Sequence, residues 1–278
     1  MLNIIRIKFV RGEEVKYISH LDLMKTFERA IRRSGIPIAY SQGFNPHPHM
    51  VFGLPLSVGV TSEAEYADFE LARPMDPEQF KEDLNNTLPK GLSILSAKEK
   101  HVKDNIMASI GIAKYVLLLS TDHKQGTDDL KNKIVEFMRM PEIIVKKEGK
   151  KGTKDVDIKP MIYNIELVDI YGDVEQHEDC EPATGCVDTN AWLRGYIRGL
   201  SEGYSKPRYS IENIFCLSTL VSAGSVANLK PELLISALEA YFSDALRTVK
   251  IHRTELFVNT KDGKINPLDD SILKKANP

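Results

Sequence analysis

The sequence has few of the residues that mark secreted, membrane-spanning or disulfide-rich proteins. It contains three cysteines and one tryptophan, and no apolar run approaches the ~20 residues that a membrane-spanning helix needs. A sparse, odd cysteine count argues against a disulfide framework and is typical of a reducing compartment. The opening residues include Arg6 and Lys8 and lack a signal-peptide cleavage site, so they predict a first strand. We therefore expect a cytoplasmic protein with no membrane partner.

The sequence also lacks a large net charge. It has 37 basic and 39 acidic residues, which gives a formal charge of −2. Attraction to a nucleic acid must therefore come from local basic patches, because the charge of the whole chain does not supply it. At 278 residues, with 42% hydrophobic and 27% charged residues, the chain is expected to fold and is long enough for two domains.

The periodicity of apolar residues predicts the element order β-α-β-β-α-β twice. The first pass has predicted extended segments at residues 3–10, 37–41, 50–60, 65–71 and 92–98, with helices after Ser19 and Asp76. The second has strands at 115–119, 143–147, 157–167, 214–221 and 249–258, with helices at 128–140 and 231–246. This pattern predicts an α+β protein of two tandem ferredoxin-like (βαββαβ) units with an insertion in the second.

The domain boundaries follow from breaks in the same pattern. We place unit 1 at residues 1–100, a linker at 101–112, unit 2 at 113–259, an insertion within it at about 169–210, and a flexible tail at 260–278. The first half of the insertion is acidic and poor in apolar residues, which is typical of a mobile loop.

The first helix carries the clearest local signal. Ser19 is placed to cap its N-terminus with Asp22 as the acidic half of a capping box, and Gly35 is placed to end it. The face opposite its apolar stripe is basic and holds Lys25, Arg29, Arg32 and Arg33. A basic helix face is either simply solvated or a phosphate-binding ridge. Only Glu28 is close enough in sequence to neutralise it, so we name these four as candidate nucleic-acid contacts.

A second basic segment is the predicted hairpin KKEGKKGTK. It contains five lysines against one glutamate: Lys146, Lys147, Lys150, Lys151 and Lys154. Lysine-rich turns protect sheet edges against aggregation, but a flexible basic finger also grips a nucleic-acid backbone. The length and glycine content of the segment favour the finger.

Three of the seven histidines lie in the opening stretch, and we name His20, His47 and His49 as candidate catalytic residues. Histidine can act as a general base near neutral pH. The alternative is that His20 only helps to cap the helix, and that His47 and His49 do not point the same way because Pro48 lies between them. Asn45, in the same loop, is a further candidate nucleic-acid contact.

No segment of the sequence has a convincing metal-site pattern. There is no HExxH, and the spacing of Cys180, Cys186 and His177 fits no common zinc or iron–sulfur site. The segment Ser222–Lys230 could bind an anion through backbone N–H groups, but a structural turn is the favoured interpretation.

The stretch YISHLDLMKTFERAIRRSGIPIAYSQGFNPHPHMVFGLPLSVGVTSE resembles the opening of the bacterial radical-SAM-linked (radical-SAM-associated) proteins, a domain of unknown function. The segments at Gly149–Pro160 and Ile251–Phe257 and the SAGS…NLKPE segment strengthen the resemblance. It implies that the chain works with a radical SAM enzyme. The partner would hold S-adenosylmethionine and an iron–sulfur cluster, with cobalamin as a further candidate. This chain has no C-x₃-C-x₂-C motif, so no cofactor is expected on it.

Three functions remain open at this stage. The first is an RNA-binding accessory that presents RNA to the radical SAM enzyme. The second is a metal-independent endoribonuclease using His20 or His47 as general base. The third is a protein-only scaffold that binds its partner through the acidic insertion. The sequence leaves open whether the chain is an enzyme, with a non-catalytic partner favoured, and its oligomeric state.

Overall fold

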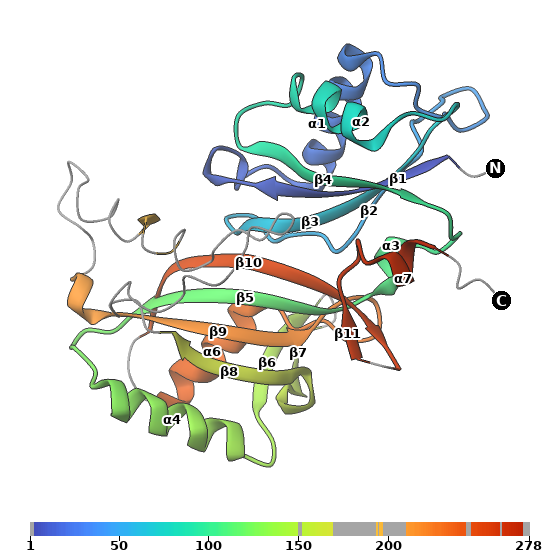
Figure 1. Cartoon of the computed structure of the whole chain (residues 1–278). Helices are drawn as coiled ribbons and strands as arrows, with labels where there is room; N and C mark the ends of the chain where they lie inside the picture. The colour runs from blue at the N-terminus through green and yellow to red at the C-terminus, as the bar shows by residue number, and fades with distance from the viewer. Residues whose placement is uncertain are drawn as a thin grey trace. The chain divides into compact units, whose positions relative to one another are not determined.

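The computed structural model describes residues 3–149, 152–168, 193, 195–196, 210–242, 246–261 and 263–274. The chain divides into two compact units. Unit 1 comprises Met1–Ala113, Ala223–Val226 and Arg253–Pro278, and unit 2 comprises Lys114–Ser222 and Ala227–His252. Helices pack beside a large mixed sheet, which confirms the α+β class (Figure 1). In the described part of the chain, no helix combines the length and the apolar composition that a membrane crossing requires.

Unit 1 is built on three antiparallel strands. Its elements are β1 (Ile4–Arg11), the 3₁₀ turn η1 (Glu13–Val15), α1 (His20–Ser34), β2 (Met50–Phe52), β3 (Thr61–Glu70), α2 (Pro77–Asn85), β4 (Leu92–Lys100), α3 (Ile106–Ser109), β11 (Gly263–Ile265) and α7 (Asp270–Leu273). Strand β1 lies between β3 and β4 and is antiparallel to both. The short strand β2 pairs with the other edge of β3. Helices α1 and α2 lie together on one side of these strands (Figure 1).

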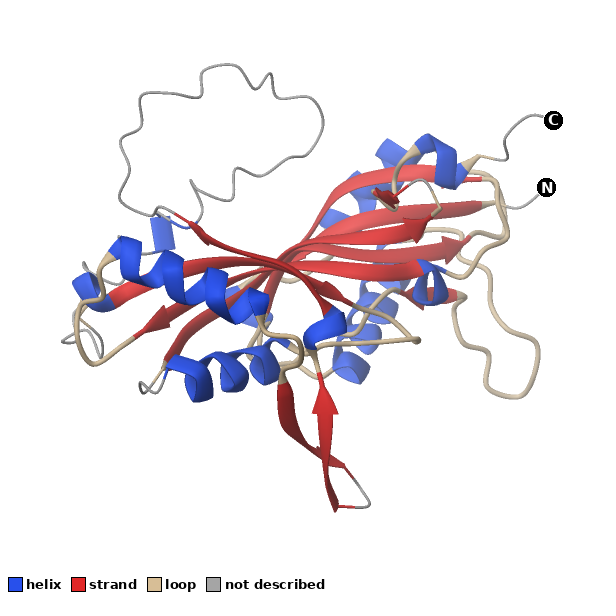
Figure 2. Cartoon of the chain, turned by 90° about the horizontal axis from the view of Figure 1, so that it is seen from below, coloured by secondary structure: helices blue, strands red, loops and turns tan. Residues whose placement is uncertain are grey.

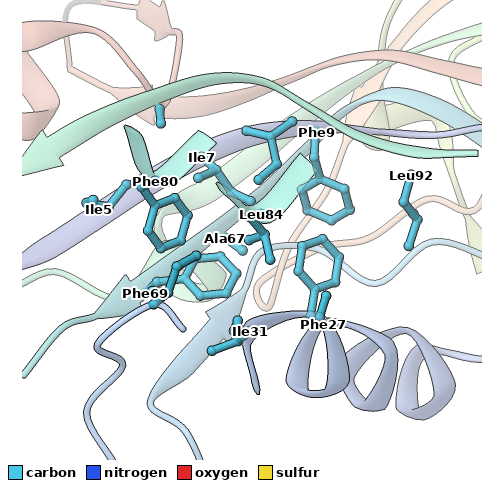
Figure 3. Close-up of a cluster of buried hydrophobic side chains, with 14 of the residues drawn as sticks. Ile5, Ile7, Phe9, Phe27, Ile31, Ala67, Phe69, Phe80, Leu84 and Leu92 are labelled. Carbon is cyan, nitrogen blue, oxygen red and sulfur yellow. The ribbon is translucent and has the colours of Figure 1, made fainter. Parts of the chain in front are cut away.

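The core of unit 1 follows from the alternation of side chains along the strands. Ile5, Ile7 and Phe9 point to the face that α1 and α2 cover, and all three are buried. The ring of Phe27 on α1 lies 5.0 Å from that of Phe9 and 5.3 Å from that of Phe52. Figure 3 shows this aromatic and aliphatic cluster between the helices and the strands. Its contacts fix which face of α1 points outward.

The opposite face of the same strands is charged, yet it is also buried. Arg6 donates to both carboxylate oxygens of Asp68, at 2.6 and 2.9 Å, and Lys100 Nζ lies 2.6 Å from the same carboxylate. The C-terminal segment covers this face, since Arg6 also donates to the carbonyl of Pro267. The alternation of polar and apolar residues at 65–71 is typical of a strand with one face in water, but both faces of residues 65–69 are buried. The predicted flexible tail contains β11 and α7, and Leu273 is buried.

Unit 2 holds the remaining elements. They are β5 (Ile110–Ser120), α4 (Thr127–Arg139), β6 (Ile144–Gly149), β7 (Gly152–Asp157), the 3₁₀ turn η2 (Lys159–Met161), β8 (Ile162–Val168), the 3₁₀ turn η3 (Ile211–Asn213), β9 (Ile214–Ser222), α6 (Pro231–Phe242) and β10 (Arg247–Thr260). The chain passes between the units within β5 and within β10. In unit 2 the hydrogen-bonded order is β10-β5-β9-β8, and β6 pairs only with β7.

Several predicted boundaries differ from the structure. Residues 37–41 form only isolated bridges at Ile38 and Tyr40. The extended run at 50–60 ends at Phe52, because Pro55 has no N–H to donate and Gly59 turns the chain with φ 88°. The predicted linker at 101–112 is part of the fold, since it contains α3 with the buried Ile106. The acidic half of the predicted insertion at 169–210 lies outside the described residues.

Candidate nucleic-acid interface

Helix α1 begins and ends where its sequence predicts. Ser19 Oγ accepts a hydrogen bond from the N–H of Asp22 at 3.1 Å and donates to the Asp22 carboxylate at 2.7 Å. The bond from Ser19 is the main reason why the pKa of Asp22 lies below its ordinary value. Gly35 closes the helix in the left-handed conformation with φ 71°. The capping interaction between Ser19 and Asp22 is therefore confirmed.

The outer face of α1 is basic and mostly free of carboxylates. Its four basic residues, Lys25, Arg29, Arg32 and Arg33, are all exposed. Arg32 pairs with Glu28 at 3.5 Å, and Arg33 donates to the carbonyl of Thr87 at 2.6 Å. Within the described residues, the structure gives no ion pair to Lys25, Arg29 or Arg33. This face therefore presents cationic groups along about two helical turns.

His20 is the first residue of α1 and is half-buried. Its ring meets the ring of Phe52 edge to face, with centroids 5.9 Å apart. Burial is the largest cause of the lowered pKa of His20, and the charge of Arg11 acts in the same direction while Glu65 opposes both. The imidazole is therefore neutral at neutral pH and packed against an aromatic ring.

The structure does not bring His20 and His49 together. His49 Nδ1 lies 2.9 Å from Glu70 Oε2, and both side chains are exposed. His49 and Phe52 are three residues apart along extended backbone, so their side chains point to opposite faces of the sheet. Phe52 faces α1 and His20, which leaves His49 on the other face.

Residues 41–48, in the connection between α1 and β2, form an exposed loop whose two ends are joined by hydrogen bonds. The N–H of Ser41 donates to the carbonyl of His47, and the N–H of His47 donates to Ser41 Oγ, each at 2.9 Å. Just outside this closure, Tyr40 and Pro48 form an isolated bridge. Asn45 and His47 are both exposed on this loop, and Phe44 beside them is fully exposed.

Strands β6 and β7 form a hairpin whose far end extends away from the rest of unit 2 (Figure 2), while at its base Val145 is buried and β6 contacts α6. Their register places Lys147 directly opposite Lys154 and Lys146 opposite Asp155. By strand alternation, one face of the hairpin has Lys147 facing Lys154. The other face carries Lys146 together with Glu148, Asp155 and Asp157 and is net acidic. Lys150 and Lys151 lie outside the described residues.

A buried charged cluster in unit 1 escaped the sequence analysis. Arg253 donates to Glu65, with its Nη2 2.7 Å from Oε1, and to the carbonyl of Leu54 at 3.1 Å. Arg11 donates to the carbonyls of Lys16 and Ile18, which immediately precede the cap of α1. Arg11 therefore holds the segment that leads into the helix. The partners of Arg253 lie about 190 residues away in the sequence, so no local pattern could predict them.

Two other segments noted in the sequence have structural roles or lie outside the described chain. A Cβ on Gly224, which has φ 104°, would come within 2.1 Å of the Ile110 carbonyl oxygen, so the SAGS segment is a tight structural turn. Cys216 is buried, and burial raises the pKa of its thiol to about 12. Among the described residues no three His, Cys, Asp or Glu side chains are grouped as metal ligands. Cys180, Cys186 and His177 lie outside them.

Solved structures resemble this chain only distantly. A Cbf5-Nop10-Gar1 complex has a TM-score of 0.44 at 10% identity, covering 90% of this chain and 49% of that one. An H/ACA RNP bound to a substrate RNA containing 2'-deoxyuridine has a TM-score of 0.40 at 10% identity, covering 90% and 46%. An unknown protein from Galdieria sulphuraria has a TM-score of 0.22 at 10% identity, covering 89% and 98%. This chain thus spans about half the length of the first two, and similarity of this order does not extend to a shared function.

Comparison with curated proteins finds no match. Residues 5–191 match a family whose description is "Uncharacterized protein conserved in bacteria (DUF2344)". That description names no radical SAM enzyme. The comparison therefore shows the bacterial family and does not show a link to a radical SAM enzyme. Because the match covers more than half of the chain, this protein belongs to the DUF2344 family of uncharacterized bacterial proteins.

Proposed function

We propose that this protein is an RNA-binding accessory protein that holds its RNA mainly through the phosphate backbone. The observation that carries the proposal is the hairpin of β6 and β7, where Lys147 lies directly opposite Lys154. Like charges in directly opposed positions of an antiparallel pair destabilise it. An isolated two-stranded hairpin is itself only marginally stable in water. A bound polyanion would neutralise both lysines and remove this repulsion.

The basic face of α1 supplies a second set of phosphate contacts in the same proposal. Lys25 and Arg29 lie four residues apart, so their charged ends extend from the same side of the helix. Arg29 donates to Thr26 Oγ1 at 3.1 Å, which orients its guanidinium without neutralising it. A guanidinium so placed can bind a phosphate with two parallel hydrogen bonds.

The accessory role includes a partner, which we propose to be a radical SAM enzyme that modifies the bound RNA. The resemblance of residues 17–63 to radical-SAM-linked proteins supports this. S-adenosylmethionine, the iron–sulfur cluster and, as a further candidate, cobalamin would then belong to the partner.

A partner of this kind predicts a specific capture result. The tagged full-length protein should retain a radical SAM enzyme when purified from bacterial lysate, and mass spectrometry of the eluate identifies it by its C-x₃-C-x₂-C motif. Nuclease treatment should reduce the recovery if RNA bridges the two proteins. Recovery that nuclease leaves unchanged would support the protein-only scaffold instead, and an eluate without such an enzyme contradicts the partnership.

We also propose the finer description of the fold as two tandem ferredoxin-like units. The strand orders support it, since unit 1 has β4-β1-β3 with β2 on the far edge of β3, and unit 2 has β10-β5-β9-β8. In unit 2 the hairpin of β6 and β7 is then an addition before the second ferredoxin-like strand, β8. An addition that takes no part in the sheet is free to serve as a binding finger.

The endoribonuclease alternative, which needs His20 or His47 as its general base, gains no support from a grouping of the three histidines. A general base must lie within hydrogen-bond reach of the proton that it removes. His20 packs against Phe52, and His49 lies on the opposite face of the sheet, so these two do not act on one substrate atom. His47 remains exposed on the loop, where it is free to contact RNA.

Neutralising the hairpin tests the proposed function. The double variant Lys147→Gln, Lys154→Gln is expected to bind a mixed-sequence single-stranded RNA about 25-fold more weakly at 0.1 M salt. Each lost phosphate contact removes about 0.7 from the slope of log affinity against log salt, so the slope should flatten by about 1.4. Fluorescence anisotropy across a salt series measures both quantities.

The matched control is Lys124→Gln, Lys131→Gln, which removes the same charge from exposed positions of unit 2. Its affinity and slope should stay near those of the wild type. Wild-type protein that binds no RNA even at low salt would end the proposal. Equal losses of RNA affinity in both double variants would show that the hairpin acts only through the net charge of the protein.

A further inference from the structure

The loop of residues 41–48 in unit 1 has a defined conformation. Its ends are joined by the two hydrogen bonds between Ser41 and His47, and it is anchored to the sheet where the N–H of His49 donates to Ala39 at 2.8 Å. Gly43 turns the tip with φ 135°, a backbone conformation that favours glycine. The side chains at the tip are therefore presented on a closed support.

The tip of this loop exposes an aromatic ring to water. Phe44 is fully exposed, whereas the phenylalanines of α1, β2 and β3 are packed together in the core. An aromatic ring gains by burial, so leaving one in water at a loop tip is unfavourable unless a ligand covers it. A flat π-face that is open on a protrusion is the form that a stacking ligand needs.

The groups beside Phe44 are polar, and none of them is a carboxylate, a lysine or an arginine. Gln42, Asn45 and His47 are exposed on the same loop, which contains no Asp, Glu, Lys or Arg. Amide side chains both donate and accept, so they match the mixed donor and acceptor edges of nucleobases. Phosphates are bound by cations instead, and in unit 1 α1 supplies those separately.

We infer that the loop of residues 41–48 takes up one unpaired nucleobase, stacked on Phe44 and hydrogen-bonded at its edge by Gln42, Asn45 or His47. The inference rests on the proposed function and names its substrate class as single-stranded RNA. Bases in an A-form duplex are stacked on both faces and their edges are paired, so the ring of Phe44 has no access to them. The loop thus selects an unpaired base, and α1 and the hairpin bind the backbone.

A protein ligand fits the same loop less well. Protein interfaces obtain their affinity from clustered apolar anchors that are surrounded by a rim excluding water. This loop offers one aromatic ring, and its only other apolar side chains are those of Pro46 and Pro48, so it has no cluster of large apolar anchors. One ring with amides around it has the size and chemistry of a base-binding site.

The experiment compares Phe44→Ala and Phe44→Trp in the full-length protein. The RNA probes are a single strand, the same strand with one abasic site, and a blunt duplex of equal length. Loss of one base–aromatic stack corresponds to a loss of about 5- to 150-fold in affinity. We expect Phe44→Ala to show this loss on the single strand with an unchanged salt slope, and Phe44→Trp to keep the wild-type affinity. A 2-aminopurine placed in the strand should lose fluorescence with wild-type protein but not with Phe44→Ala.

The outcomes separate this inference from the proposed function. Val226→Ala, which removes a fully exposed apolar side chain elsewhere in unit 1, is the control and should change nothing. Phe44→Ala with unchanged RNA affinity, or equal loss on strand and duplex, overturns base capture while salt-dependent RNA binding stands. If Phe44→Ala instead abolishes binding of a protein partner and leaves RNA binding intact, the loop is a protein contact and the inference is wrong. Absence of RNA binding by the wild type overturns both.

Discussion

Replacing Asp68 with alanine is expected to lower the free energy of unfolding by about 3–5 kcal/mol. The Asp68 carboxylate accepts two hydrogen bonds from Arg6 and one from Lys100. Both cationic side chains are almost completely buried, so removing the carboxylate leaves two desolvated charges facing each other. Asp104 contacts both but is only partly buried, and it cannot replace Asp68 at the centre of the cluster. Urea denaturation followed by circular dichroism measures the change.

The matched control is Asp270→Ala, which removes a carboxylate that also contacts two cationic side chains. Its pairs with Lys98 at 3.3 Å and Lys274 at 2.8 Å are exposed, and exposed pairs contribute about 0–1 kcal/mol. A third variant, Asp68→Asn, keeps the size and one acceptor of the side chain and should fall between the two. Similar losses for Asp68→Ala and Asp270→Ala would show that the buried cluster has no special role in stability.

This cluster also marks the limit of what the sequence could predict. The alternation of Tyr66, Asp68 and Glu70 with apolar residues correctly indicated a strand. It wrongly indicated a solvated face, because the segment that covers it lies about 200 residues later in the chain. Burial of a charged face depends on such distant partners, and a local pattern carries no information about them.

The sequence correctly predicted features whose interacting residues lie a few positions apart in the chain. The Ser19–Asp22 capping interaction and the Gly35 ending of α1 follow from residues a few positions apart, and the structure confirms both. The grouping of the histidines was a statement about sequence proximity only. Near β2, three residues of separation along extended backbone are enough to place His49 and Phe52 on opposite faces.

The candidate interface was likewise predicted only in part from the sequence. Sequence composition located the basic hairpin but could not assign its register. The structure pairs Lys146 with Asp155 and leaves Lys147 opposite Lys154, so the lysines of the hairpin are not equivalent. A shift of the register by one residue would have exchanged these two faces, and only the hydrogen-bonded pairing decides between them.

Neutralising the outer face of α1 should have the largest effect on RNA binding. The triple variant Lys25→Gln, Arg29→Gln, Arg32→Gln removes three exposed cations. With about 0.7 units of salt slope for each contact on a single strand, the slope should flatten by about 2 and the affinity at 0.1 M salt fall about 100-fold. Glutamine has nearly the helix propensity of lysine and arginine, so the helix itself should stay intact. Arg33 is left in place because its bond to the Thr87 carbonyl joins α1 to the segment after α2.

The control removes three exposed lysines of unit 1 that lie outside α1, in the variant Lys103→Gln, Lys261→Gln, Lys264→Gln. It should leave the slope within error of the wild type. Combining the α1 variant with the hairpin double variant then asks whether both surfaces hold one RNA. If they do, the two slope changes add to about 3.5 on one strand, since each contact releases its own counterions. A combined slope no flatter than that of the hairpin variant alone would mean that α1 contacts no phosphate, and the RNA-binding role would then rest on unit 2 alone.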